Sequence, residues 1–78
     1  MAIKIVFYSE VIDNLGRTKS STKGADIFNV LNDVEEWTDD MIFYDENGQM
    51  YFIDDLAGKE VWVAEVGLFT VPVEEKGM

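Results

Sequence analysis

Two apolar runs flank an Asn-Gly pair, Asn47 and Gly48, within residues 41–53. An Asn-Gly pair in such a setting is the strongest short-range signal for a β-hairpin, because both residues tolerate the positive φ angles of a type I′ turn. A two-residue loop places Tyr44 opposite Tyr51. The pattern therefore predicts two antiparallel strands around which the rest of the chain packs.

This register gives the hairpin two apolar faces, since side chains alternate across a strand. One face lacks polar tips, and we expect it to join the core; it carries Met41, Phe43, Met50 and Phe52. The other face is amphipathic and serves either as an exposed cross-strand pair or as a protein interface; it carries Ile42, Tyr44, Tyr51 and Ile53.

Acidic residues lie at both ends of the predicted hairpin. The register continued outward places Asp40 opposite Asp55, with Asp39 and Asp54 beside them. Like charges that face each other destabilise a ladder. The strands therefore fray there, or a hard cation binds there, or a partner's Lys or Arg does. The turn end carries a second acidic pair, Asp45 and Glu46.

Alternation over residues 2–8 predicts a first strand with its apolar set, Ile3, Ile5 and Phe7, toward the core. Residues 9–23 contain the main basic stretch and are expected to form a loop or a ragged extension of that strand.

Apolar residues spaced i, i+3, i+4 and i+7 predict a helix over residues 24–37, with Ser21 or Thr22 as its N-cap. A turn over residues 54–59 leads to a last strand over 61–71, bent at Gly67, and a loose tail follows.

The resulting order, β-α-β-β-β, predicts an α+β fold: a curved four-stranded antiparallel sheet with one helix packed on one face. A length of 78 residues fits one domain, 1–78. The last strand carries Val61 and Val63 on one side and Trp62 on the other, so both sides are apolar. Because one helix covers one face, the second face is either wet or paired with another molecule.

The charge of this chain is unevenly distributed around its net value of −10. Residues 1–25 hold four basic residues and two acids, whereas residues 26–65 hold twelve acids against Lys59. Such density repels nucleic acid and anionic membranes and attracts cationic surfaces. Glu35 and Glu36 even lie at the C-terminal end of the predicted helix, where the helix dipole disfavours anions.

The chain has no His and no Cys, so acid–base catalysis would rest on carboxylates, Tyr or Lys, and transition-metal ligands are lacking. We expect no enzyme activity, no catalytic residues, no cofactor and no metal site. The N-terminus lacks the basic region and apolar core of a signal peptide, and no apolar run approaches a membrane span. These features favour a cytoplasmic protein.

In overall character the chain resembles the small acidic proteins that bacteriophages encode against host enzymes, such as anti-CRISPR proteins and nucleic-acid mimics. The resemblance lies in size, charge, the lack of Cys and His, and an α+β pattern with paired acids such as Asp39-Asp40 and Asp54-Asp55. It implies an inhibitor of a defence or nucleic-acid enzyme, acting in the host cytoplasm.

The leading hypothesis is therefore a non-enzymatic acidic protein that occupies a cationic site on a basic host protein, such as a nucleic-acid-binding enzyme. It binds neither nucleic acid nor membranes directly. The residues expected to contact the partner are the acids Glu35, Glu36, Asp39, Asp40, Asp45, Glu46, Asp54 and Asp55 and the apolar set Ile42, Tyr44, Tyr51 and Ile53. The alternatives are a small structural or regulatory module that forms a homodimer, and a carboxylate-based enzyme or metal-dependent protein.

Overall fold

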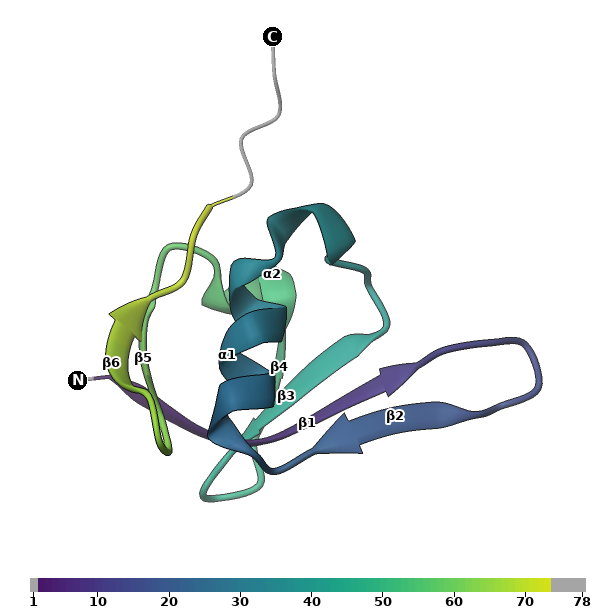
Figure 1. Ribbon diagram of the computed structural model, residues 1–78, viewed down its shortest axis with the longest axis horizontal. Helices are drawn as coiled ribbons and strands as arrows, with labels where there is room; N and C mark the ends of the chain where they lie inside the picture. The colour runs from purple at the N-terminus through teal and green to yellow at the C-terminus, as the bar shows by residue number, and fades with distance from the viewer. Residues whose placement is uncertain (1, 74–78) are drawn as a thin grey trace, which may run out of the picture.

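The long strand β1 organises a six-stranded mixed sheet in the computed structural model, which describes residues 2–73 (Figure 1). The strands are β1 (Ile3–Val11), β2 (Thr18–Ser21), β3 (Met41–Asp45), β4 (Met50–Phe52), β5 (Glu60–Val63) and β6 (Gly67–Thr70). The helices are α1 (Gly24–Asn32) and α2 (Ile53–Leu56), with a 3₁₀ turn η1 (Val34–Glu36) between α1 and β3. The α+β class is confirmed, and the predicted tail over 74–78 lies outside the described residues.

The sheet order is β4-β3-β1-β5-β6, with β2 also paired to β1. One edge of β1 pairs antiparallel with β3, while its other edge pairs parallel with β5 and then antiparallel with β2. The predicted four-stranded antiparallel sheet with one helix is therefore wrong. The predicted loop over residues 9–23 and the predicted bent strand over 61–71 each reverse direction and belong to a hairpin. The second helix, α2, forms where a turn over residues 54–59 was predicted.

The β1–β2 arm, residues 9–21, projects from the body of the molecule (Figure 1). The Asp13 carboxylate holds its tip, because one oxygen accepts the Leu15 amide at 2.9 Å and the other accepts the Arg17 side chain. Leu15 is 83% exposed at this tip. A basic, solvated segment was expected here, but its pairing with β1 was not.

A β-bulge in β1 reverses the predicted alternation of its side chains. The register against β3 shifts between Ile5 and Phe7, so one extra residue enters β1. Ile5 and Tyr8 are both buried as a result, whereas Phe7 turns to the opposite face and packs against Tyr44 with ring centroids 5.4 Å apart. The prediction that Phe7 faces the core is wrong.

The β3–β4 hairpin exists as predicted but with a register shifted by one residue. Its loop has three residues, since the Asp45 amide donates to the Gln49 carbonyl and the Gly48 amide donates to the Asp45 carbonyl. Gly48 has a φ of 84°, whereas Asn47 lacks the positive φ of a type I′ turn. The Asp45 carboxylate stabilises this loop by accepting the amides of Asn47 and Gln49, at 2.8 and 3.0 Å.

The shifted register exchanges the faces of β4. Met41 and Phe43 are buried as predicted, but Met50 and Phe52 point away from the core and are about half exposed. Tyr51 takes their place, because it lies opposite Phe43 and packs against the core. The predicted apolar faces are therefore correct for β3 and wrong for β4.

Helix α1 buries Ile27 and Leu31 against the sheet, as its spacing predicts, but it ends at Asn32. Neither Ser21 nor Thr22 caps it: the N-cap is Lys23, whose amide donates to the Ser21 hydroxyl. The start of the helix lies directly against the β5–β6 turn. An ideal Cβ at Gly24 would meet the Ala64 carbonyl oxygen at 1.4 Å, so only glycine fits there.

Both helices and one face of the sheet share a single core, which includes Ile53 and Leu56 of α2 and Val61, Val63 and Val71 around β5 and β6. The predicted sidedness of the last strand is confirmed for Val61 and Val63, which are buried, and for Trp62, which is exposed. The opposite face of the sheet has no helix of the described chain upon it.

Candidate functional site: an acidic groove beside the arm

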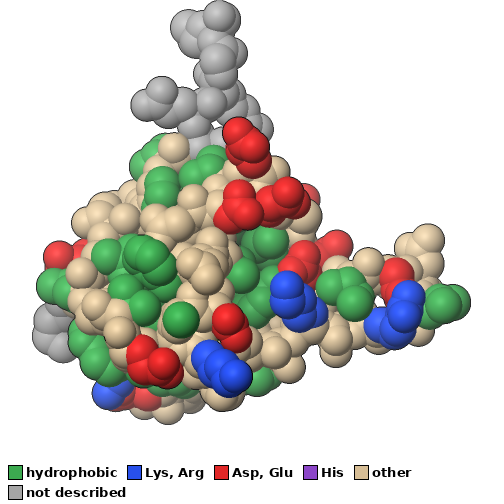
Figure 2. Space-filling view, in the orientation of Figure 1, with side chains coloured by type: hydrophobic (Ala, Val, Ile, Leu, Met, Phe, Trp, Pro, Cys, Tyr) green, Lys and Arg blue, Asp and Glu red, His purple; other side chains and the backbone are tan. Residues whose placement is uncertain are grey.

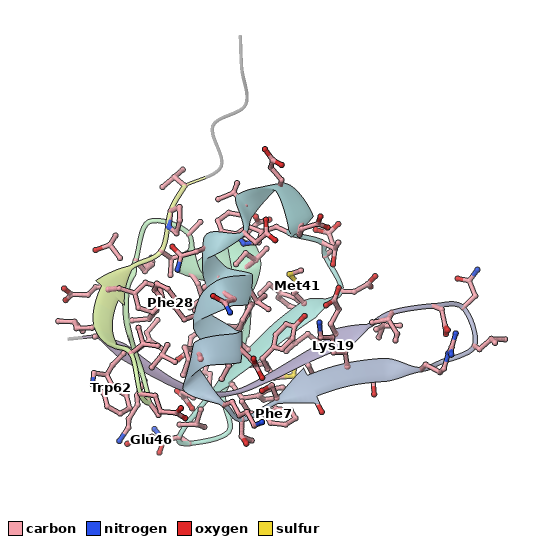
Figure 3. The ribbon with its side chains drawn as sticks, viewed as in Figure 1. Phe7, Lys19, Phe28, Met41, Glu46 and Trp62 are labelled. Carbon is pink, nitrogen blue, oxygen red and sulfur yellow. The ribbon has the colours of Figure 1, made fainter. Side chains whose placement is uncertain are left out.

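An open groove of about 640 Å³ lies between the β1–β2 arm and the helical segment formed by α1 and η1. Figure 3 shows Lys19 and Met41 on the side of the molecule where the groove lies. Its lining combines residues from all of these elements: Tyr8, Glu10, Ile12, Lys19, Ser20, Ser21, Asp26, Asn29, Val30, Asp33, Glu36 and Met41.

The helical wall of the groove carries Asp26, Asp33 and Glu36. Asp26 lies in the first turn of α1, whereas Asp33 follows the end of that helix and Glu36 lies on η1. Ile27 and Leu31 occupy the stripe that packs on the sheet. The polar wall thus begins on the side of α1 that does not pack on the sheet and continues through the exposed acids Asp33 and Glu36.

The strand wall of the groove carries Tyr8 and Glu10, which lie on the same side of β1. The Tyr8 hydroxyl donates a hydrogen bond to the Glu10 carboxylate. Burial raises the pKa of Tyr8 well above its ordinary value, and the bond to Glu10 raises it further. Tyr8 therefore remains a neutral donor at physiological pH and holds the carboxylate of Glu10 in place. Lys19 faces Glu10 across the arm and supplies the basic group of this wall.

The groove acids have no cationic partner within residues 2–73. The ion pairs found there join Lys4 to Glu46, with a nitrogen–oxygen distance of 3.4 Å, and Arg17 to Asp13. Asp26 accepts a hydrogen bond from the Ser21 hydroxyl at 3.1 Å, which fixes its side chain without neutralising it. Four carboxylates thus face one lysine, an arrangement suited to a guanidinium or ammonium group.

The predicted acidic residues fall into separate groups. Glu35 and Glu36 lie on η1, and Asp39 and Asp40 follow in the turn before β3, all exposed. Figure 2 shows acidic side chains gathered where η1 lies in Figure 1. Asp45 and Glu46 lie at the other end of β3, where Asp45 is committed to its loop and Glu46 pairs with Lys4.

The predicted face-to-face arrangement of Asp40 and Asp55 is wrong, because Asp54 and Asp55 belong to α2 and not to a strand. The Asp55 carboxylate instead accepts the Phe52 amide at 3.1 Å and stabilises the start of that helix. Across the described part of the chain, no three acidic side chains come together in a way that could hold a metal ion. The cation alternative for this cluster is not supported.

The predicted apolar contact residues do not form one face either. Ile42 and Tyr44 lie on the helix-free face of the sheet, whereas Ile53 is buried in α2. Tyr51 packs against the core, and its hydroxyl donates to Asp45 at 3.0 Å.

Three acids of the groove were missed from the sequence: Glu10, Asp26 and Asp33. Asp26 and Asp33 lie outside the apolar stripe of the predicted helix, and this was a signal that could have identified the helical wall, although α1 ends before Asp33. Glu10 had no such signal, because its position depends on the bulge in β1 and on the extension of that strand into the arm.

Among residues 2–73, no helix is long and apolar enough to cross a membrane. Comparison of the chain with protein-family models, with curated proteins and with solved structures gave no match.

Proposed function

We propose that this chain is a non-enzymatic binding protein whose acidic groove and η1 surface occupy a cationic site on a host protein. The observation that carries the proposal is the set of four groove carboxylates that lack a cationic partner among the described residues. Carboxylates in this state attract a partner's Lys and Arg and accept charge-assisted hydrogen bonds from them.

The shape of the groove favours binding of a protruding segment of the partner over a flat contact. Its two walls come from different elements and border an open volume of about 640 Å³. The exposed acids of η1 and of the following turn extend the negative surface beyond the groove. We therefore expect an extended or helical basic segment of the partner to enter the groove. The charges on either side of that segment then contact Glu35 and Asp39.

The partner that fits this charge pattern is a protein whose basic site ordinarily receives phosphate groups. Carboxylates held on a folded scaffold present negative oxygens to Arg and Lys much as a nucleic-acid backbone does. We therefore propose that the chain inhibits a nucleic-acid enzyme, or a defence enzyme of the type that phage-encoded inhibitors block, by excluding its substrate in the cytoplasm.

A pull-down from bacterial lysate tests this function. The tagged chain is used as bait at about 0.1 M and about 1 M NaCl, since exposed charge pairs are screened at high salt. We expect a basic protein to be captured at low salt and released at high salt. After nuclease treatment removes its own nucleic acid, this partner should no longer bind added nucleic acid while the chain is bound to it. Capture that is unaffected by salt would contradict the proposal. So would capture that neither added RNA nor added DNA reduces.

The matched variants are Asp33→Asn with Glu36→Gln, in the groove, and Glu60→Gln with Glu65→Gln, in the β5–β6 hairpin. Both pairs remove two negative charges from exposed side chains. The groove pair is expected to abolish capture, whereas the hairpin pair retains it. Equal losses would show that only the net charge matters.

A further inference from the structure

Glu10 is the least exposed of the four acids that line the groove. Asp26, Asp33 and Glu36 on the helical wall are exposed, whereas Glu10 is half-buried. A charge that is partly removed from water interacts more strongly with an opposite charge, because the dielectric around it is lower. Glu10 is therefore the carboxylate at which the attraction to a cation in the groove is strongest.

The strand pairing places Glu10 in the middle of a row of three side chains on the floor of the groove. Met41 on β3 lies opposite Glu10, and Lys19 on β2 lies opposite it on the other side; Figure 3 labels both. Side chains of directly opposite residues share one face of a sheet. The carboxylate thus has an apolar neighbour on one side and a cationic neighbour on the other, and all three line the groove.

The Tyr8 hydroxyl orients this carboxylate. Tyr8 is 1% exposed, and its hydroxyl donates a hydrogen bond to Oε1 of Glu10. A carboxylate has about four acceptor sites on its two oxygens, so this bond leaves most of them for a ligand. Because Tyr8 is neutral, the bond fixes the position of the carboxylate and leaves its negative charge intact.

Lys19 does not neutralise Glu10, although the two residues face each other. The salt bridges found within residues 2–73 join other groups, and none of them links Lys19 with Glu10. Lys19 is exposed, and its ammonium group is strongly hydrated, so it gains little by moving toward apolar side chains. A ligand cation that binds Glu10 must therefore tolerate apolar contact and approach from the side of Met41.

The guanidinium group of arginine meets both conditions. It is planar and more weakly hydrated than an ammonium group, so it packs on apolar surface more readily. Its fork of N–H donors also matches the two oxygens of a carboxylate. Met41, Val30 and Ile12 provide the apolar surface of the groove, and Glu10 provides the carboxylate. The groove therefore combines the two features that distinguish arginine from lysine.

We propose that the Tyr8–Glu10 part of the groove binds a single arginine side chain of the partner protein and prefers arginine to lysine. Glu10 accepts the guanidinium group, Met41 packs against its flat face, and Tyr8 is a positioning residue that acts through Glu10. This inference rests on the function proposed above, because it requires a basic segment in the groove. It adds the residue type that is selected and the carboxylate that selects it.

Isothermal titration calorimetry with two synthetic peptides tests the preference. Both peptides are short, rich in lysine and equal in charge, and they differ only at the central residue, which is arginine in one and lysine in the other. The titrations use about 50 mM NaCl, at which exposed charges are weakly screened. We expect the parent chain to bind both peptides and to bind the arginine peptide about tenfold more tightly.

Glu10→Gln removes the charge of Glu10 and retains its length and an oxygen that accepts the Tyr8 hydrogen bond, so folding is preserved. We expect this variant to bind the arginine peptide about tenfold more weakly and the lysine peptide less than about threefold more weakly, so that the preference is lost. Glu60→Gln, at an exposed acid of β5, is the matched control and should change either affinity by less than about twofold.

Tyr8→Phe tests the positioning role, because it removes the hydroxyl and keeps the buried ring. We expect the preference for the arginine peptide to fall by about threefold, while the lysine peptide binds nearly as before. Circular dichroism verifies that the variant folds. A merely structural role of Tyr8 would lower both affinities alike, and an unchanged preference would likewise refute its action through Glu10.

The results separate this inference from the function on which it rests. If the parent chain binds neither peptide, the function and the inference both fail. If it binds both with equal affinity, or if Glu10→Gln weakens both alike, the groove still receives a cationic segment and the arginine preference is refuted. A preference that survives in Glu10→Gln would also overturn the inference, because another group would then select arginine.

Discussion

Tyr44 lies opposite Met50 across the β3–β4 hairpin, one residue away from the Tyr51 partner that a two-residue loop would give it. The carboxylate of Asp45 accounts for the difference, because it accepts two backbone amides of the loop and favours a three-residue turn. One side chain thus decides which face of β4 joins the core and which is exposed on the helix-free face of the sheet.

The two possible loops of this hairpin make different demands on their residues. In the observed loop only Gly48 has a positive φ, so Gly48→Ala should lower the free energy of unfolding by about 1 kcal/mol. Asn47→Ala should cost much less, because Asn47 has an ordinary backbone conformation. Urea unfolding of the two variants measures this difference. A similar loss for both would instead indicate the type I′ loop.

The stability contributed by Asp45 should depend on pH. Hydrogen bonds from the Gln49 and Asn47 amides, opposed by partial desolvation, hold the pKa of Asp45 below its ordinary value. Because the pKa of Asp45 is lower in the folded than in the unfolded state, its stabilising effect is fully present above the unfolded value of about 4. This stability is lost as the pH falls below that value and through the folded pKa. Acidification should therefore destabilise the parent chain more than Asp45→Asn. Urea unfolding between neutral and acidic pH measures both, and parallel pH profiles would contradict the assignment.

The two acids of α2 should differ in their effect on stability. Asp55 accepts the Phe52 amide, so Asp55→Ala should destabilise the fold by about 1 kcal/mol. Asp54 is exposed on the same short helix and has no such contact, so Asp54→Ala is the control and should cost about 0.3 kcal/mol. Thermal unfolding of the two variants gives the comparison. A gain in stability from Asp55→Ala would contradict this role and would instead support the predicted repulsion between Asp40 and Asp55.

The parts of the fold that depend on local pattern could be predicted from the sequence. The spacing of Ile27 and Leu31 identified the core face of the helix, and the turn signal at Gly48 located a hairpin. Register could not be predicted, because it depends on hydrogen bonds made by the Asp45 side chain and on one extra residue in β1. A shift of one residue exchanges every side chain between the two faces of a strand.

The candidate site was predicted only in part for the same reason. Acidic character was evident from composition, and Glu36 was named, but Asp54 and Asp55 were placed on a strand that is in fact a helix. The groove itself depends on the arm, which forms because residues that resembled a loop pair with the end of β1. This pairing is local, with Val11 opposite Thr18, but the polar run of β2 lacks the apolar alternation by which a strand is predicted.

Isothermal titration calorimetry with an arginine-rich peptide is the most direct test of the central claim, that the groove carboxylates receive a cationic segment. The parent chain, Asp33→Asn with Glu36→Gln, and Glu60→Gln with Glu65→Gln are titrated at about 50 mM and about 300 mM NaCl. We predict that the groove pair weakens binding by about tenfold or more, that the hairpin pair changes it less than about twofold, and that salt weakens the parent complex. Equal weakening by both pairs would contradict the account.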